Sequence, residues 1–269
     1  MPEQNPVRLY DANYGQFASE LYAQVRTAAF GEDIGQSGWL TAEEHDLFVR
    51  WLDPGPASHL LDVACGSGGT TLRIARLTGC RVQGIDLHPQ GIAAANEAAQ
   101  KQGLHERAAF HVADAGLPLP FADASFDGVI CTDAVNHLPE RQSVFSEWAR
   151  VLVPGGRLVF TDPIVVTGAL TSEEIAIRAS IGFFLFVPPG LDEMLLREAG
   201  LEPTDVVDRT ENMAKSAQRW HDARAARADD LRRIEGTETF EGQQRFLSVA
   251  ARLASERRLS RIAYRAVRG

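Results

Sequence analysis

The sequence predicts an α/β protein whose mainly parallel sheet is covered by helices on both faces. Short apolar strand-like segments alternate with helix-like segments from about residue 58 to 161, and glycine or proline stands at most junctions. Short apolar strands of this kind are typical of parallel sheets buried on both sides. The chain has 269 residues, 45% of them hydrophobic, enough for one large domain or for one domain with a cap.

The strand-like segments of this middle region are residues 58–64, 81–86, 108–112, 126–131 and 157–161. The helix-like segments between them are residues 70–77, 90–102 and 139–152, and a Pro-Gly-Gly turn at 154–156 follows the last. Parallel strands bring their carboxyl ends to one edge of the sheet, so we expect a ligand site there.

The two ends of the chain lie outside this alternation. A capping-box pattern at residues 41–44 predicts a helix to about Trp51, and the segment ahead of it, 30–39, is glycine-rich. After residue 190 we expect a helix at 190–199, a strand at 203–208, helical stretches at 211–235 and 240–257, and a last strand at 259–267. We therefore divide the chain into an N-terminal helical lid segment (1–52), a core (53–210), a helical insertion or cap (211–258) and the last core strand (259–269).

Composition excludes several classes of protein. The formal charge of −9 disfavours a nucleic-acid partner. No apolar run approaches the roughly 18 residues that cross a bilayer, and the first thirty residues hold no apolar signal core. The three cysteines, Cys65, Cys80 and Cys131, have neither a disulfide pattern nor metal-ligand spacing. We expect a cytoplasmic protein without a bound metal or a membrane partner.

The most informative stretch is residues 60–71, LLDVACGSGGTT. A strand delivers Asp62 to its carboxyl end, and a loop containing Gly66 and Gly68 leads into a helix. Glycines there permit positive φ and a close approach of a ligand to the backbone. A dinucleotide loop would need glycine where Thr71 stands, and the Lys-Ser/Thr pair of a phosphate loop is missing.

Acidic residues follow three successive predicted strands: Asp62, Asp86 and Asp114. A carboxylate at the position of Asp62 would repel a pyrophosphate but would suit an ammonium or sulfonium ligand. Asp86 can accept hydrogen bonds from two ribose hydroxyls, and Asp114 can accept one from an exocyclic amine. Together the three acids indicate a ligand with an amino acid amine, a ribose and an adenine, which is S-adenosylmethionine.

This pattern resembles the class I S-adenosylmethionine-dependent methyltransferases. The matching segments are LLDVACGSGG (60–69), GID (84–86), VADA (112–115), FDGVICTDAVNHLP (126–139) and RVLVPGGRLVFTD (150–162). The resemblance implies a Rossmann-like sheet of seven strands, mostly parallel with the last strand antiparallel. It also implies S-adenosylmethionine as the cofactor. One departure is Ala64, which stands where the family usually has the first loop glycine.

The small-molecule members of that family are the most similar, namely sarcosine/dimethylglycine-type N-methyltransferases and natural-product or sugar O-methyltransferases. The glycine-rich segment at 31–35 and the helical insertion carry this looser likeness. The resemblance implies these cofactor-binding residues: Asp62, Ala64, Gly66, Gly68, Asp86, Leu87, Asp114, Ala115 and Thr132.

The resemblance also implies a catalytic pair, with His137 as a base and Asp162 as its acidic partner. The alternative is that His137 only packs or caps the following helix. Methyl transfer is an in-line displacement on an activated sulfonium, so a neutral amine needs no base, whereas a hydroxyl usually does. We expect a small-molecule acceptor, with nitrogen placed ahead of oxygen, and a monomer or homodimer.

Aromatic residues are candidates for the wall of the acceptor pocket, although each could equally be ordinary core. They are Trp39, Phe183, Phe184, Phe186 and Trp220, and Tyr10 and Tyr14 could close over the cofactor from a lid helix. Two other functions stay open at this point. One is a cofactor-binding protein that does not methylate, such as a cyclase or a regulator, and the other is a nicotinamide-dependent oxidoreductase.

Overall fold

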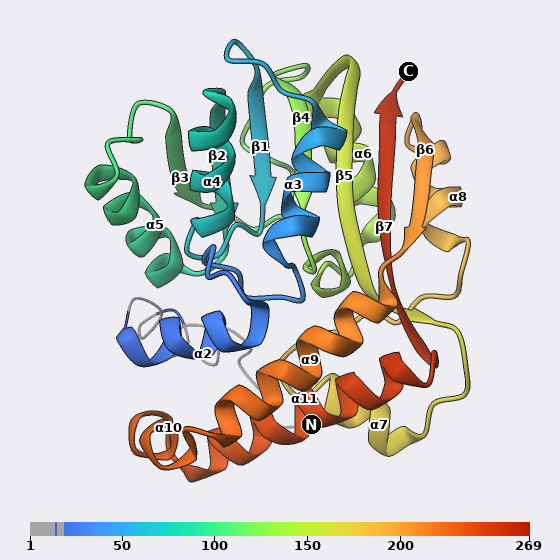
Figure 1. Cartoon of the computed structure of the whole chain (residues 1–269). Helices are drawn as coiled ribbons and strands as arrows, with labels where there is room; N and C mark the ends of the chain where they lie inside the picture. The colour runs from blue at the N-terminus through green and yellow to red at the C-terminus, as the bar shows by residue number, and fades with distance from the viewer. Residues whose placement is uncertain (1–13, 15–18) are drawn as a thin grey trace.

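The computed structural model describes residue 14 and residues 19–269, and the expected lid residue Tyr10 lies outside that range. Its centre is a seven-stranded sheet with the strand order β3-β2-β1-β4-β5-β7-β6 (Figure 1). Strand β7 runs antiparallel to β5 and to β6, and the pairs among β1 to β5 are parallel. The predicted fold class is confirmed, down to the antiparallel last strand.

The strands are β1 (His59–Val63), β2 (Arg81–Asp86), β3 (Ala108–Val112), β4 (Phe126–Cys131), β5 (Leu152–Val166), β6 (Leu201–Asp208) and β7 (Leu259–Arg268). Strand β5 is longer than expected because it runs through the Pro-Gly-Gly sequence that predicted a turn. The pairing of β5 with β4 shifts register beside that sequence, where Gly155 has a φ of 77°. The three residues therefore form an irregularity inside a strand.

The helices on the sheet are α3 (Ala42–Leu52), α4 (Gly69–Thr78), α5 (Pro89–Lys101), α6 (Arg141–Val151) and α8 (Leu191–Glu198), with a short 3-10 turn η1 (Val135–His137) after β4. Apolar residues of α3, α4 and α5 pack on one face of the sheet, with Phe48, Leu72 and Ile92 at the centre. Residues of α6 and α8 pack on the other face around Trp148 and Phe145. Helix α3 thus belongs to the sheet's helical cover.

The remaining helices form a cap: α2 (Glu20–Phe30), α7 (Ser172–Arg178), α9 (Thr210–Ala225), α10 (Ala228–Glu235) and α11 (Thr237–Ser255). Figure 1 shows them beyond the edge to which the arrow of β1 points, which is the carboxyl edge of the parallel strands. They enclose two further apolar clusters, around Leu247 and around Leu231. Helix α2 falls within the predicted N-terminal helical lid segment, whereas α7 was not predicted. In the described part of the chain no helix is long and apolar enough to cross a membrane.

A buried ion-pair network holds α3 and the N-terminal segment at Trp39 to the sheet. Arg261 of β7 is fully buried and donates to both carboxylate oxygens of Asp133, at 2.6 and 3.2 Å, and to Glu44 of α3 at 2.7 Å. Asp133 also accepts from the backbone amide of Trp39 at 2.7 Å and from the hydroxyl of Thr161 at 2.8 Å. The carboxylate after β4 therefore ties the last strand, the sheet and the N-terminal segment together.

We predict that Arg261→Met lowers the free energy of unfolding by about 3–5 kcal/mol. The substitution leaves the buried Asp133 carboxylate without its cation and removes from Glu44 the nearer of its two arginines, since Arg209 lies 3.7 Å away. Arg265→Met is the matched control on the same strand, since Arg265 makes only a partly exposed pair with Asp205 at 3.3 Å and should change stability by less than about 1 kcal/mol. Denaturant unfolding measures both. Equal effects of the two substitutions would contradict the role assigned to the network.

Candidate active site

A cavity of about 290 Å³ opens at the carboxyl edge of the parallel strands. Six of the nine expected cofactor residues line it: Ala64, Asp86, Leu87, Asp114, Ala115 and Thr132. They come from the ends of β1, β2, β3 and β4, so the topology alone brings them together. Asp62, Gly66 and Gly68 do not line this cavity and lie in or beneath the loop that borders it.

The loop from β1 to α4 needs glycine at two positions, because each has a positive φ and a close neighbour where a Cβ would stand. Gly68 has a φ of 74°, and a Cβ there would come within 2.7 Å of the Phe110 ring and of the Ala95 side chain. Gly66 has a φ of 57°, and the Tyr14 hydroxyl lies 3.0 Å from where its Cβ would be. Ala64 also has a positive φ, 58°, a conformation that costs a non-glycine residue roughly 1–2 kcal/mol.

Asp62 is buried beneath the loop and accepts a hydrogen bond from the Thr71 hydroxyl at 2.5 Å. Burial raises its pKa to about 7, and the nearby Asp86 charge acts in the same direction, whereas the Thr71 bond opposes the shift. Thr71 stands where a dinucleotide loop would have glycine, and its observed role is to anchor this carboxyl group. A cation placed next to Asp62 would draw it into the ionised form.

Asp86 lines the cavity, but most of its hydrogen-bonding capacity is used within the protein. Its Oδ2 accepts from the Gly66 amide at 2.8 Å, and its Oδ1 accepts from the backbone amide and the ring Nδ1 of His88 at 2.9 and 2.8 Å. A carboxylate has about four acceptor sites, so a two-hydroxyl grip on a ribose requires His88 to turn away. Asp114 is exposed and accepts from the Gly116 amide at 2.8 Å.

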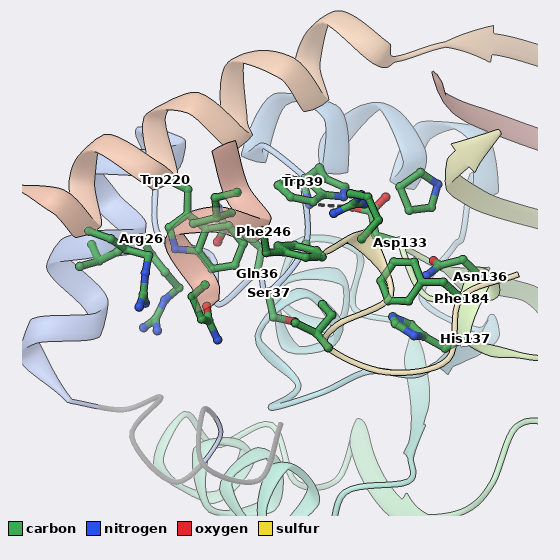
Figure 2. Close-up of a pocket in the computed structure, with 18 of the residues that line it drawn as sticks. Arg26, Gln36, Ser37, Trp39, Asp133, Asn136, His137, Phe184, Trp220 and Phe246 are labelled. Carbon is green, nitrogen blue, oxygen red and sulfur yellow. Dashed lines mark hydrogen bonds between the residues drawn. The ribbon is translucent and has the colours of Figure 1, made fainter. Parts of the chain in front are cut away.

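A second cavity, of about 110 Å³, shares part of its wall with the first. Figure 2 shows residues that line this second cavity. Five described residues line both cavities: Tyr14, Ser37, Gly38, Asp133 and His137. Aromatic and apolar side chains line about half of the second cavity, among them Trp220 and Phe246 from the cap and Trp39 and Phe184 from irregular segments. Because the walls are shared, a group bound in one cavity lies beside a group bound in the other.

His137 lies at this junction, at the end of η1. Its Nδ1 lies 2.9 Å from the carbonyl oxygen of Phe183, and its ring meets the Phe184 ring edge-on at 4.7 Å. A carbonyl only accepts, so Nδ1 carries the proton, and Nε2 is the basic nitrogen of the neutral ring. Burial lowers the pKa of His137, and the Arg178 charge adds to this, so the neutral form dominates near pH 7.

Asp162 does not form the expected pair with His137. It is fully buried, its Oδ2 accepts from Arg141 at 2.5 Å, and its Oδ1 accepts from the Ile164 amide at 3.0 Å. Arg141 also donates to Asp192 at 2.8 Å, which ties α6 and α8 to the end of the sheet. Asp162 lines neither cavity, so the structure assigns it to this ion-paired cluster, and the Phe183 carbonyl takes the place expected of it beside His137.

The aromatic residues expected to line the acceptor pocket do not all lie in one cavity. Trp39, Phe184 and Trp220 line the second cavity, and Phe183 lines the first. Phe186 lines neither of these two cavities and packs against Phe184, with 6.4 Å between the ring centroids. Phe183 and Phe186 belong to a segment without regular structure, where sequence spacing does not predict which side chain faces inward.

Sequence reasoning missed several residues of these cavities: Ser37, His88, Asp133, Asn136 and Arg178. For one of them, Arg178, the sequence holds a signal of the helix on which it lies. Thr171 and Glu174 form a reciprocal capping box that starts α7, and α7 ends at Arg178. The others depend on contacts between distant segments, which no local pattern reveals.

A family model described as a methyltransferase domain matches residues 61–160. The 27-O-demethylrifamycin SV methyltransferase of Amycolatopsis mediterranei (strain S699) is 33% identical over 221 residues, a match that covers 76% of this chain and 81% of that protein. The chain belongs to the S-adenosylmethionine-dependent methyltransferases. It is a class I methyltransferase that acts on small molecules, and its cofactor is S-adenosylmethionine. The comparisons give no support to a nicotinamide-dependent oxidoreductase.

Solved structures show how widely this methyltransferase fold is used. A protein from Galdieria sulphuraria described as a sarcosine dimethylglycine methyltransferase aligns with a TM-score of 0.79 at 20% identity, over 96% of this chain and 98% of that one. The [4+2]-cyclase SpnF also aligns with a TM-score of 0.79, at 22% identity, over 97% and 95% of the chains. At these identities the likeness concerns the fold alone, so the chemistry is argued from the site.

The residues around the first cavity fit the cofactor, which supplies an activated methyl group when bound. Burial raises the pKa of the Asp62 carboxyl group toward neutrality, and an ammonium group beside it would restore its charge. Leu87 and Ala115 offer an apolar surface for a base, with Asp114 at the rim. These assignments of individual contacts are proposals.

We predict that cofactor binding releases a proton at pH 6. Below its pKa of about 7 Asp62 is protonated in the free enzyme, and a bound ammonium requires the carboxylate. Affinity should therefore rise with pH up to about 7 and level off above it. Titration calorimetry with S-adenosylhomocysteine, in two buffers of different ionisation enthalpy at pH 6 and 8, measures the release.

Asp62→Asn should remove both the proton release and the pH dependence, and should weaken binding. Asp229→Asn is the control, because Asp229 lies exposed on α10, with a side chain 95% accessible. A wild-type affinity that does not change between pH 6 and 8 would show that Asp62 does not face the cofactor's charge.

Proposed function

We propose that this methyltransferase moves the methyl group of S-adenosylmethionine to a hydroxyl oxygen of a small molecule held in the second cavity. The observation that carries the proposal is His137, which lines both cavities and whose Nδ1 is bound to the Phe183 carbonyl. That bond leaves Nε2 as the basic atom at the boundary between donor and acceptor. A hydroxyl acceptor needs such a base, since its pKa lies far above 7.

The step requires the sulfur, the methyl group and the acceptor oxygen to lie in line. As the oxygen bonds the methyl carbon and the carbon–sulfur bond breaks, the hydroxyl proton passes to His137, and S-adenosylhomocysteine remains. Asp162 takes no part in this scheme. The related rifamycin enzyme supports it, because its name describes transfer to an oxygen.

A nitrogen acceptor, which the sequence placed first, is the second candidate. The aromatic wall of the second cavity, with Trp39 and Trp220, would suit an amine as well as a hydroxyl compound. Nitrogen and oxygen acceptors differ in their need for a base.

The cysteines of the chain are free thiols, in keeping with our proposal that the enzyme works in the reducing cytoplasm.

We predict that His137→Gln lowers kcat for hydroxyl acceptors about 100-fold or more, the contribution of a general base. Its affinity for S-adenosylhomocysteine should stay within about twofold. The lowered pKa of His137 places the acid limb of the wild-type pH–rate profile below pH 6.5, with activity lost as pH falls and His137 protonates. Methyl-labelled S-adenosylmethionine with a panel of hydroxyl and amine metabolites measures these rates.

His105→Gln is the control, because His105 is exposed in the loop after α5. Wild-type rates and an unchanged acid limb in His137→Gln would reduce His137 to a packing role and favour nitrogen. Cofactor binding without transfer to any acceptor would favour the non-methylating alternative.

A further inference from the structure

Asn136 is a buried polar side chain in the wall of the second cavity. It belongs to η1 and is 1% exposed, and among the described residues neither its Nδ2 nor its Oδ1 has a hydrogen-bond partner. Buried amide groups in native proteins are almost always hydrogen-bonded, because an unsatisfied one has lost its bonds to water without replacement. An unpaired amide in a cavity wall therefore indicates that its partner is the molecule that the cavity binds.

The backbone around Asn136 is fixed by the irregular segment that follows α7. The carbonyl oxygen of Asn136 accepts from the Leu185 amide at 2.8 Å. On the next residue, the Nδ1 of His137 lies 2.9 Å from the Phe183 carbonyl oxygen. Figure 2 shows Asn136, Phe184 and His137 together at one end of the cavity. The amide of Asn136 is thus held beside the residue proposed to take the proton of the acceptor.

Aromatic rings make up much of the wall to which Asn136 belongs. Phe246 stacks on Trp39 with 6.3 Å between the ring centroids, and Phe184 meets Phe246 edge-on at 6.4 Å. The cavity volume of about 110 Å³ is of the same order as the roughly 150 Å³ that holds benzene in another protein. A wall of this kind suits one aromatic ring, which can pack its faces and edges against the rings of the protein.

The amide of Asn136 determines which polar groups this ring should carry. Its Oδ1 accepts hydrogen bonds and its Nδ2 donates them, and both atoms leave one planar group side by side. Asparagine uses this arrangement to bind an adjacent donor and acceptor at once, as it does on the edge of adenine. Two hydroxyls on neighbouring ring carbons offer the same pair, because one can donate to Oδ1 while the other accepts from Nδ2.

We propose that the acceptor is a catechol-type molecule, an aromatic ring with two adjacent hydroxyls, and that Asn136 selects it by bonding to both oxygens. The inference rests on the proposed function for the identity of this cavity as the acceptor site. The hydroxyl that accepts from Nδ2 is the one methylated. Its oxygen bonds the methyl carbon, the carbon–sulfur bond breaks, and its proton passes to His137. The other hydroxyl stays bound to Oδ1, so the product carries one methyl group.

The experiment compares catechol with resorcinol, which are isomers that differ only in the spacing of their two hydroxyls. Their affinities for the enzyme with S-adenosylhomocysteine bound are measured by ligand-observed NMR at pH 7 under nitrogen. The wild-type enzyme should bind catechol about tenfold or more tightly than resorcinol, the effect of one or two net hydrogen bonds.

Asn136→Leu replaces the amide with an apolar side chain of similar shape and should lower the affinity for catechol to that for resorcinol. Because the amide has no partner to lose, the Tm of the free enzyme should stay the same or rise. Asn136→Ala should also remove the preference, and it decides the question if Asn136→Leu does not fold. Gln100→Leu is the control, since Gln100 is exposed on α5, and it should keep the wild-type preference.

The inference is overturned if the wild type does not prefer catechol, or if a folded Asn136 variant keeps the preference. A lower Tm for Asn136→Leu would contradict the claim that the amide lacks a partner in the protein. Catechol that binds preferentially but is not methylated by labelled S-adenosylmethionine would instead count against the proposed function. Methylation of other hydroxyl compounds without a preference for catechol would overturn this inference alone.

Discussion

The buried ion pair between Asp133 and Arg261 is the interaction on which the site depends. One carboxylate directly after β4 accepts from the last strand, from Thr161 of β5 and from the backbone of Trp39, while it lines both cavities. Its φ of 55° is unfavourable for a non-glycine residue, and these bonds hold it there. Without this carboxylate, the segment that carries Ser37, Gly38 and Trp39 would lose its fixed position over the sheet edge.

The first cavity is acidic, which fits the cofactor proposed for it. Asp86 and Asp114 line this cavity and Asp62 lies beneath the loop that borders it, and these acids suit a ligand with a sulfonium and an ammonium group. Because the two cavities share the wall that contains His137, the methyl group and the acceptor would meet there.

Much of this could be predicted from the sequence, because the informative patterns are local. Parallel strands share one edge, so Asp62, Asp86 and Asp114 could be placed together from strand order alone. The partners of Asp162 could not, since Arg141 and Asp192 come from different helices and meet it only in the folded chain. The same is true of Asp133, whose binding to Arg261 joins residues 128 positions apart. In the irregular segment at 182–187, no period distinguishes Phe184, which faces the cavity, from Phe186.

A crystal structure of the enzyme with S-adenosylhomocysteine tests the central claim most directly. We expect the adenosyl group in the cavity between Leu87 and Ala115, the amino group near Asp62, His88 turned away from Asp86, and the sulfur facing the wall that Tyr14 and His137 share with the second cavity. A ligand whose sulfur faces away from His137, or that occupies the second cavity, would contradict the account of donor and acceptor as neighbours across that wall.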